Sequence, residues 1–280
     1  LQLMGPLGIL ASTIQISLLQ YHLTTEQFLD WGWRIPFWVS LFLLVVAFYA
    51  RRSIEETPAF LELSKKGQTE SQLLNNFKDK EIRKRMLLLF LCISSSGAIL
   101  FFCVQVYTGI FLKTSVKLEP ALVDKLSILA TFALLPLTIF CGWLSDLYGR
   151  KSVVLSGIIL GAVFIYPSFR MLEQLGHTFT AIGTLSSLLG ISGILLFLTT
   201  TLALVVGPQT ALLAEFFFAK NRNSAATLPH NLAAGWIGGL LPFIITWLNQ
   251  AIDSNLAGLW YPVIFLGFAV IIALRFFPEG

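Results

Sequence analysis

The residues of this chain that could do chemistry stand in short polar turns between long apolar segments. The clearest turn reads Gly-Trp-Leu-Ser-Asp-Leu-Tyr-Gly-Arg-Lys over residues 142–151. Asp146 ends one apolar segment, where its carboxylate could reach the N-terminal N–H groups of a neighbouring helix. Gly149 permits a tight reversal, and Arg150 and Lys151 suit the surface of a membrane. The spacing predicts two helices joined by a charged turn, and the plain alternative is an ordinary short turn.

Further polar residues within apolar segments could contact a small molecule. Amide and hydroxyl groups could bind a carboxylate, and aromatic faces could hold a quaternary ammonium group by cation–π attraction. The alternative for each is hydrogen bonding or packing between helices. The candidates for a substrate pathway are Gln105, Tyr107, Asn231 and Trp236, with Thr199–Thr201 at similar depth.

The sequence lacks the residue patterns of the common catalytic and nucleotide-binding sites. There is no Ser/His/Asp set, no HExxH and no Walker or Rossmann glycine pattern, and the chain holds only 3 His. The three cysteines, Cys92, Cys103 and Cys141, lie in apolar stretches without metal-ligand spacing and are expected to pack in the core. We therefore expect no enzyme, no metal and no cofactor.

The elements that hold these residues follow from composition. The 280 residues are 56% hydrophobic and 12% charged, include 24 Phe and have a mean hydropathy of +0.78. A soluble domain has about 25% charged residues, so the apolar excess must face hydrocarbon. The net charge of +4 is too small and too clustered to suggest a nucleic-acid partner. The sequence therefore predicts an all-α integral membrane protein.

Eight spans are expected, because about 20 apolar helical residues cross a bilayer. The long sixth segment is taken as one crossing, with a kink at Gly207-Pro208. The chain begins with Leu1 and is apolar at once, which predicts a piece that begins inside a span. The expected spans are Leu3–Leu19, Ile35–Tyr49, Met86–Leu112, Leu126–Leu144, Val153–Phe169, one within Phe179–Leu213, Thr227–Leu248 and Trp260–Phe277.

Charge placement predicts the topology. If every span crosses once, 14 of the 19 Lys and Arg fall on one side, which the positive-inside rule makes cytoplasmic. The C-terminus is then cytoplasmic. Two spans precede a basic linker and six follow it, an outline of a two-lobed transporter. The predicted parts are residues 1–50, the last two helices of an N-terminal half; 51–85, a cytoplasmic central linker; and 86–280, a C-terminal six-helix half.

Motifs at the turns resemble those of the major facilitator superfamily. The 142–151 segment resembles its G-x-x-x-D-x-x-G-R-[KR] loop, where Gly142 would let helices approach closely. Trp31-Gly-Trp-Arg-Ile-Pro-Phe37 and Glu55-Glu-Thr-Pro-Ala-Phe60 resemble the W-G-W-R-I-P-F and E-x-T-P-x-F pair of its metabolite:proton symporter family. That family includes bacterial proline/betaine, 2-oxoglutarate, citrate and shikimate transporters. The resemblance covers the whole chain, as helices five to twelve of twelve.

The resemblance implies a charged network at the cytoplasmic face. Glu215 and Arg222, with six residues between them, resemble the E-x6-R pair of the sugar-porter branch. Such a network could hold the two lobes together there while the site faces outward, whereas solvated interfacial charges are the alternative. The predicted gate network comprises Glu56, Asp146, Arg150, Lys151, Glu215 and Arg222.

The resemblance also implies proton-coupled uptake of a small zwitterionic osmolyte or an organic acid by alternating access in a bacterial inner membrane. The centres of the spans hold no Asp, Glu, Lys or Arg, so the coupling carboxylate is expected in the absent first four helices, with His230 as a candidate proton relay. Departures from the family at Gly109, Phe111, Phe217 or Phe218, Ala225 and His230 leave the substrate open. Alternatives are a non-transporting sensor of the same fold, an uncoupled facilitator or an inert fragment.

Overall fold

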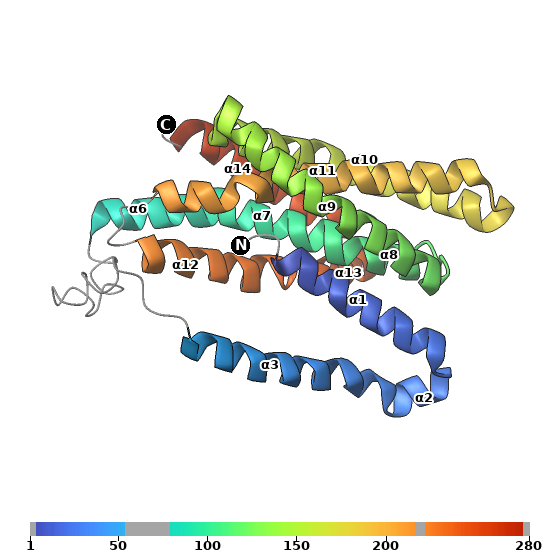
Figure 1. The fold of residues 1–280 in the computed structure, drawn as a ribbon. Coiled ribbons are helices and arrows are strands. Elements are labelled where there is room, and N and C mark those ends of the chain that lie inside the picture. The colour runs from blue at the N-terminus through green and yellow to red at the C-terminus, as the bar shows by residue number, and fades with distance from the viewer. Residues whose placement is uncertain (1–3, 54–78, 217–221, 277–280) are drawn as a thin grey trace.

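The computed structural model describes residues 4–53, 79–216 and 222–276, and every regular element within them is helical. Figure 1 shows the helices running side by side, with the C-terminus, the start of α6 and the start of α12 at one end. We call this the Gly149 end, after the turn between α9 and α10, and the other the Gly183 end, after the turn between α10 and α11. The expected all-α fold is confirmed.

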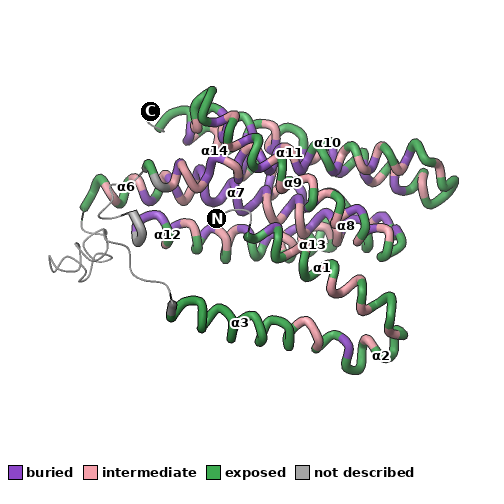
Figure 2. Tube along the Cα trace, in the orientation of Figure 1, coloured by how far each residue is buried: buried purple, intermediate pink, exposed green. Residues whose placement is uncertain are grey.

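The first two predicted spans form a V of helices at the edge of the bundle (Figure 1). A capping box closes the α2 N-terminus: the Gln27 backbone N–H donates to the Thr24 hydroxyl, and the Gln27 side chain accepts from the Thr24 N–H. The α1 helix packs against α9, whereas α3 is exposed over residues 37–52, as Figure 2 shows. The elements are α1 (Met4–His22), α2 (Thr25–Asp30), the 3₁₀ turn η1 (Gly32–Arg34) and α3 (Ile35–Ser53).

The third predicted span is the most buried of the long helices and contains two π-helical segments. Each is followed by a hydroxyl residue that donates to a carbonyl five residues earlier: Ser95 to Phe90 at 2.6 Å, and Thr108 to Cys103 at 3.0 Å. A π turn carries one extra residue, so it rotates the residues beyond it relative to an α-helix. The segments are α6 (Lys80–Leu88), η2 (Leu89–Ser94), α7 (Ser95–Phe101), η3 (Phe102–Tyr107) and α8 (Thr108–Thr114).

Three long helices follow and form the centre of the bundle. They are joined by tight turns at glycines with positive φ, Gly149 at +88° and Gly183 at +66°. A side chain there would be strained, so glycine sets both reversals. These helices are α9 (Pro120–Tyr148), α10 (Arg150–Ile182) and α11 (Leu185–Phe216).

The last two spans run in opposite directions: span seven runs from the Gly149 end to the Gly183 end, and span eight runs back. Span seven is broken by a third π segment and a turn at residues 239–240. It consists of α12 (Arg222–Leu232), η4 (Ala233–Gly238) and α13 (Leu241–Ile252). The 3₁₀ turn η5 (Ala257–Leu259) leads into α14 (Trp260–Phe276).

Seven of the eight expected spans form helices that are long and apolar enough to cross a membrane. The first expected span is a 19-residue helix, α1, but it lies outside that set, because its glycines, proline and glutamines dilute its apolar residues. The long sixth segment is one unbroken helix with Pro208 inside it, as expected. The loop expected after Phe169 is wrong: α10 continues to Ile182.

The extra length of α10 has a simple explanation. Its 33 residues measure about 50 Å at 1.5 Å per residue, well beyond a hydrocarbon core of about 30 Å. Polar residues such as Arg170 and Glu173 can therefore remain helical at the membrane surface. Within the expected linker 51–85, α3 ends at Ser53 and α6 begins at Lys80, capped by the Asp79 carboxylate; residues 54–78 lie outside the described part of the chain.

The buried apolar residues form two clusters. The large one fills the bundle between α7–α8, α9, α10, α11, α13 and α14. The small one lies at the Gly149 end and comprises Met86, Leu89, Cys92, Ile93, Leu212, Ala225, Ala226 and Ala273. The cysteines Cys92, Cys103 and Cys141 are buried free thiols within these clusters, as the sequence predicts.

Candidate functional site

The α9–α10 turn places Arg150 between two carboxylates. Its guanidinium lies 2.7 Å from Glu215 Oε1 on α11 and 3.5 Å from Asp146 Oδ1 on α9. The arginine side chain is 27% exposed, and those of Asp146 and Glu215 are 64% and 60% exposed. We call these three residues the Arg150 bridge. Because both carboxylates reach water, each pair contributes about 0–1 kcal/mol, and the bridge orients the turn more than it stabilises the fold.

The Arg150 bridge joins three of the six residues of the predicted gate network. Glu56 lies outside the described residues, and the structure describes only the backbone of Arg222, the first residue of α12. The described contacts tie α9 and α10 to α11, and a link between two lobes stays a prediction.

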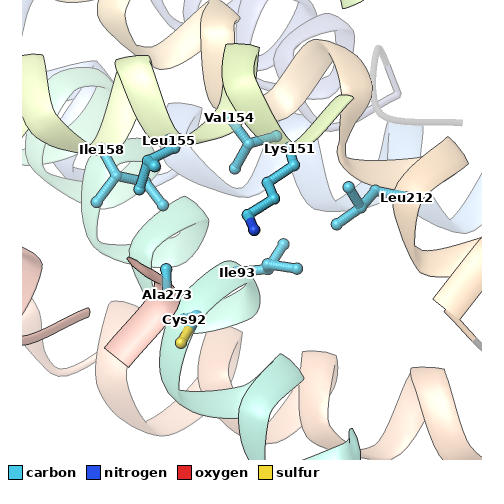
Figure 3. Close-up of a pocket in the computed structure, with 8 residues that line it drawn as sticks. All are labelled: Cys92, Ile93, Lys151, Val154, Leu155, Ile158, Leu212 and Ala273. Carbon is cyan, nitrogen blue, oxygen red and sulfur yellow. The ribbon is translucent and has the colours of Figure 1, made fainter. Parts of the chain in front are cut away.

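Lys151, the residue after Arg150, lines a cavity. Figure 3 shows its side chain reaching into a cavity of about 20 Å³ beside the small cluster. The cavity is about large enough for one water molecule. Apart from the lysine its lining is apolar: Cys92, Ile93, Val154, Leu155, Ile158, Leu212 and Ala273.

The four substrate-pathway candidates do not share one surface. Gln105 lies in η3, where its Oε1 accepts a hydrogen bond from Thr131 at 2.9 Å. Tyr107 is 2% exposed, packs against Phe111 and Phe169, and its hydroxyl accepts from Asn249 at 3.0 Å. By contrast, Asn231 and Trp236 are exposed, with Trp236 at 69%. Tyr107 thus serves core packing in this conformation.

His230, the candidate proton relay, lies in α12 within the seventh span. It is half-buried, and its Nδ1 has no hydrogen-bond partner in the described part of the chain. Its role stays a prediction.

Comparison with known proteins identifies the fold. The chain is 30% identical over 280 residues to a Staphylococcus aureus (strain MSSA476) protein named "Putative proline/betaine transporter", and the match covers 98% of the chain and 56% of that protein. It is 28% identical to the inner membrane metabolite transport protein YhjE of Escherichia coli (strain K12), with 92% of the chain and 57% of the relative covered. The chain belongs to the major facilitator superfamily.

The same bacterium's shikimate transporter is also 28% identical, over 91% of the chain and 55% of the relative. The chain thus spans little more than half the length of these relatives. No family model matches the chain, and no solved structure matches it. The relatives are transporters and not enzymes, and they support a bacterial multi-pass membrane protein.

In this superfamily member, the close helix contact predicted for Gly142 depends more on Gly207. A Cβ built on Gly207 would lie 2.8 Å from the Thr138 carbonyl oxygen and 3.0 Å from the Gly142 nitrogen, whereas one on Gly142 would meet its nearest atom at 3.8 Å. Glycine at 207 therefore lets α11 lie directly against the α9 backbone. Arg150 lies eight residues after Gly142, and Glu215 lies eight residues after Gly207. The contact between the two glycines therefore helps to set the distance between Arg150 and Glu215.

Sequence reasoning missed a polar hub at the Gly183 end. Asn249 donates to the Tyr107 hydroxyl at 3.0 Å and to the Asn255 carbonyl at 2.8 Å, and it accepts from the Gly258 N–H at 2.7 Å. Asn255 in turn donates to Glu173 on α10 at 2.9 Å. An asparagine three residues before the end of α13 was the available signal, but its three partners are up to 142 positions away in the sequence.

We expect Asn249→Ala to destabilise the protein by about 1–3 kcal/mol, because it leaves a partly buried N–H and a carbonyl without their partners. Asn231→Ala is the matched control, since the same side chain is exposed in the same span. Thermal unfolding of the purified proteins in detergent measures both. Equal melting temperatures for the two variants would show that the hub carries no stability.

Proposed function

We propose that this chain is part of a secondary transporter that takes up a small carboxylate-bearing solute by alternating access, coupled to protons. The observation that carries the proposal is the similarity to named transporters along 98% of the chain. Proline, betaine and shikimate, which appear in the names of relatives, differ in ring and charge but share a carboxylate. A zwitterionic osmolyte or an organic acid is therefore the substrate class.

The arrangement of helices fits this role. We assign residues 1–50 to the end of an N-terminal half, 51–85 to a central linker and 86–280 to the C-terminal half. The Gly149 end is proposed to be cytoplasmic, since Arg51, Arg52, Lys80 and Arg150 gather there. The Arg150 bridge would orient the turn at that face, and Glu56 and Arg222 would extend it toward the other half.

The test is uptake of radiolabelled proline, glycine betaine, 2-oxoglutarate, citrate and shikimate by cells that express the complete reading frame. We expect accumulation of one class, abolished by a protonophore. Equilibration without accumulation, insensitive to the protonophore, would indicate an uncoupled facilitator. Binding without uptake, with the protein present in the membrane, would contradict transport and favour the sensor alternative.

A further inference from the structure

Most buried hydroxyl groups in these spans donate to their own helix. Thr138, Thr199 and Thr201 each donate to the carbonyl four residues earlier, at 2.7, 2.7 and 3.0 Å. Ser94 and Ser96 are exceptions: both are 0% exposed, and neither hydroxyl has a partner within the described ranges. Buried polar groups normally have hydrogen-bond partners, so two hydroxyl groups without partners on one span require an explanation.

The same exception occurs on two other spans. Thr210 Oγ1 on α11 and His230 Nδ1 on α12 are buried atoms that also lack a partner among the described residues. Gln209, beside Thr210, is 2% exposed and packs against span three: a Cβ built on Gly97 would lie 2.8 Å from its Nε2. We call this set the polar layer: Ser94, Ser96, Gln209, Thr210 and His230.

The polar layer lies where helices cross from one apolar cluster to the other. In span three the small cluster ends at Ile93 and the large one begins at Ile99. In α11 the large cluster ends at Val206 and the small one begins at Leu212. The buried polar residues occupy both intervals, and η2, α11 and α12 contact one another. The residues of the polar layer therefore lie at one level across the bundle, whereas two further unpaired buried atoms, Ser17 Oγ and Gln105 Nε2, lie apart from it in α1 and η3.

The cavity of Figure 3 adjoins the polar layer on the side of the Gly149 end. Cys92 and Ile93, just before Ser94, line it, as does Leu212, two residues after Thr210. Lys151 enters the cavity from the turn that carries the Arg150 bridge. The small cluster thus lies between the polar layer and the charged turn, and its packing leaves a cavity.

We propose that the polar layer binds the carboxylate end of the transported solute when the small cluster parts at the Gly149 end. Hydroxyl, amide and imidazole groups can donate to carboxylate oxygens, and the polar layer itself holds no acidic residue to repel them. In the closed arrangement the hydroxyls of Ser94, Ser96 and Thr210 and the Nδ1 of His230 lack partners within the described residues, and the solute or its water supplies them on opening. This inference rests on the proposed function, which supplies the carboxylate.

Substituted-cysteine labelling tests the proposal. In a background with Cys92, Cys103 and Cys141 replaced by Ala and uptake retained, Ser94→Cys and Thr210→Cys should react with a small methanethiosulfonate reagent. Ile99→Cys is the matched control, because it is 0% exposed in the large cluster five residues from Ser94. Proline, glycine betaine or shikimate, whichever the cells accumulate, should slow labelling at least threefold.

Two results would overturn the proposal. Cells that accumulate a solute while neither new cysteine reacts would show that the polar layer stays closed during transport. Labelling that the accumulated solute does not slow would show a layer that admits water but not substrate. Failure of the proposed function is a separate result, because it appears as absent uptake before any cysteine is introduced.

Discussion

Replacing Gly207 with valine should remove most uptake and lower the melting temperature of the purified protein by about 5–10 °C. The new Cβ would fall 2.8 Å from the Thr138 carbonyl oxygen and 3.2 Å from the Cys141 Cβ. The nearest of these atoms is backbone, which cannot rotate away, so α11 must separate from α9. Overpacking of this kind costs about 1–3 kcal/mol, and it also displaces Glu215 from Arg150.

Gly193→Val is the control for this experiment, since it makes the same change in the same helix. Gly193 is exposed, and a Cβ built there meets nothing within 4 Å. The control should keep the wild-type melting temperature and uptake. Equal losses in the two variants would mean that valine is harmful anywhere in α11, and that the contact with α9 has no special role.

The Gly149 turn shows what local sequence can predict. A reversal between two long helices at a single residue needs a positive φ, and glycine followed by Arg-Lys marks such a point where the chain meets water. The Gly183 turn was misplaced, because polar residues from Arg170 onward look like a loop. Hydropathy predicts where lipid ends, whereas α10 continues through water to Ile182.

Tyr107 shows why the candidate site was harder to predict than the fold. Its depth in span three suggested contact with substrate, but it faces Asn249 and Phe169. Which way a helical residue faces follows from a period of 3.6 residues, and the π segments η2 and η3 interrupt that period. No local pattern in the sequence marks these segments, so the side chains beyond them cannot be oriented from spacing alone.

Pairing between Arg150 and Glu215 was expected from a resemblance, and the contact is present in the structure. Its partners come from α10 and α11, which follow each other in the chain across the Gly183 turn. The sequence motif therefore identified the residues, while the structure shows which helices they connect.

Arg150→Ala should reduce the initial rate of uptake severalfold, and at most about thirtyfold, without reducing the amount of protein in the membrane. The arginine joins two carboxylates, and two exposed pairs of about 0–1 kcal/mol each contribute at most about 2 kcal/mol, which corresponds to that upper factor in a conformational equilibrium. Both carboxylates are more than half exposed, so losing their partner leaves no buried charge and the fold should persist.

Glu81→Gln provides a matched control for the Arg150 variant. It removes the 3.3 Å ion pair with Arg85 at the same end of the bundle, but that pair lies within one helix and cannot report on the packing of α11. Uptake rates should be measured beside membrane abundance for both variants and for Arg150→Glu combined with Glu215→Arg, which should recover part of the rate. Unchanged uptake by Arg150→Ala at equal abundance would mean that the bridge is only a solvated surface pair, whereas loss in the single variant with recovery in the reversed pair would establish that the contact between α10 and α11 controls transport.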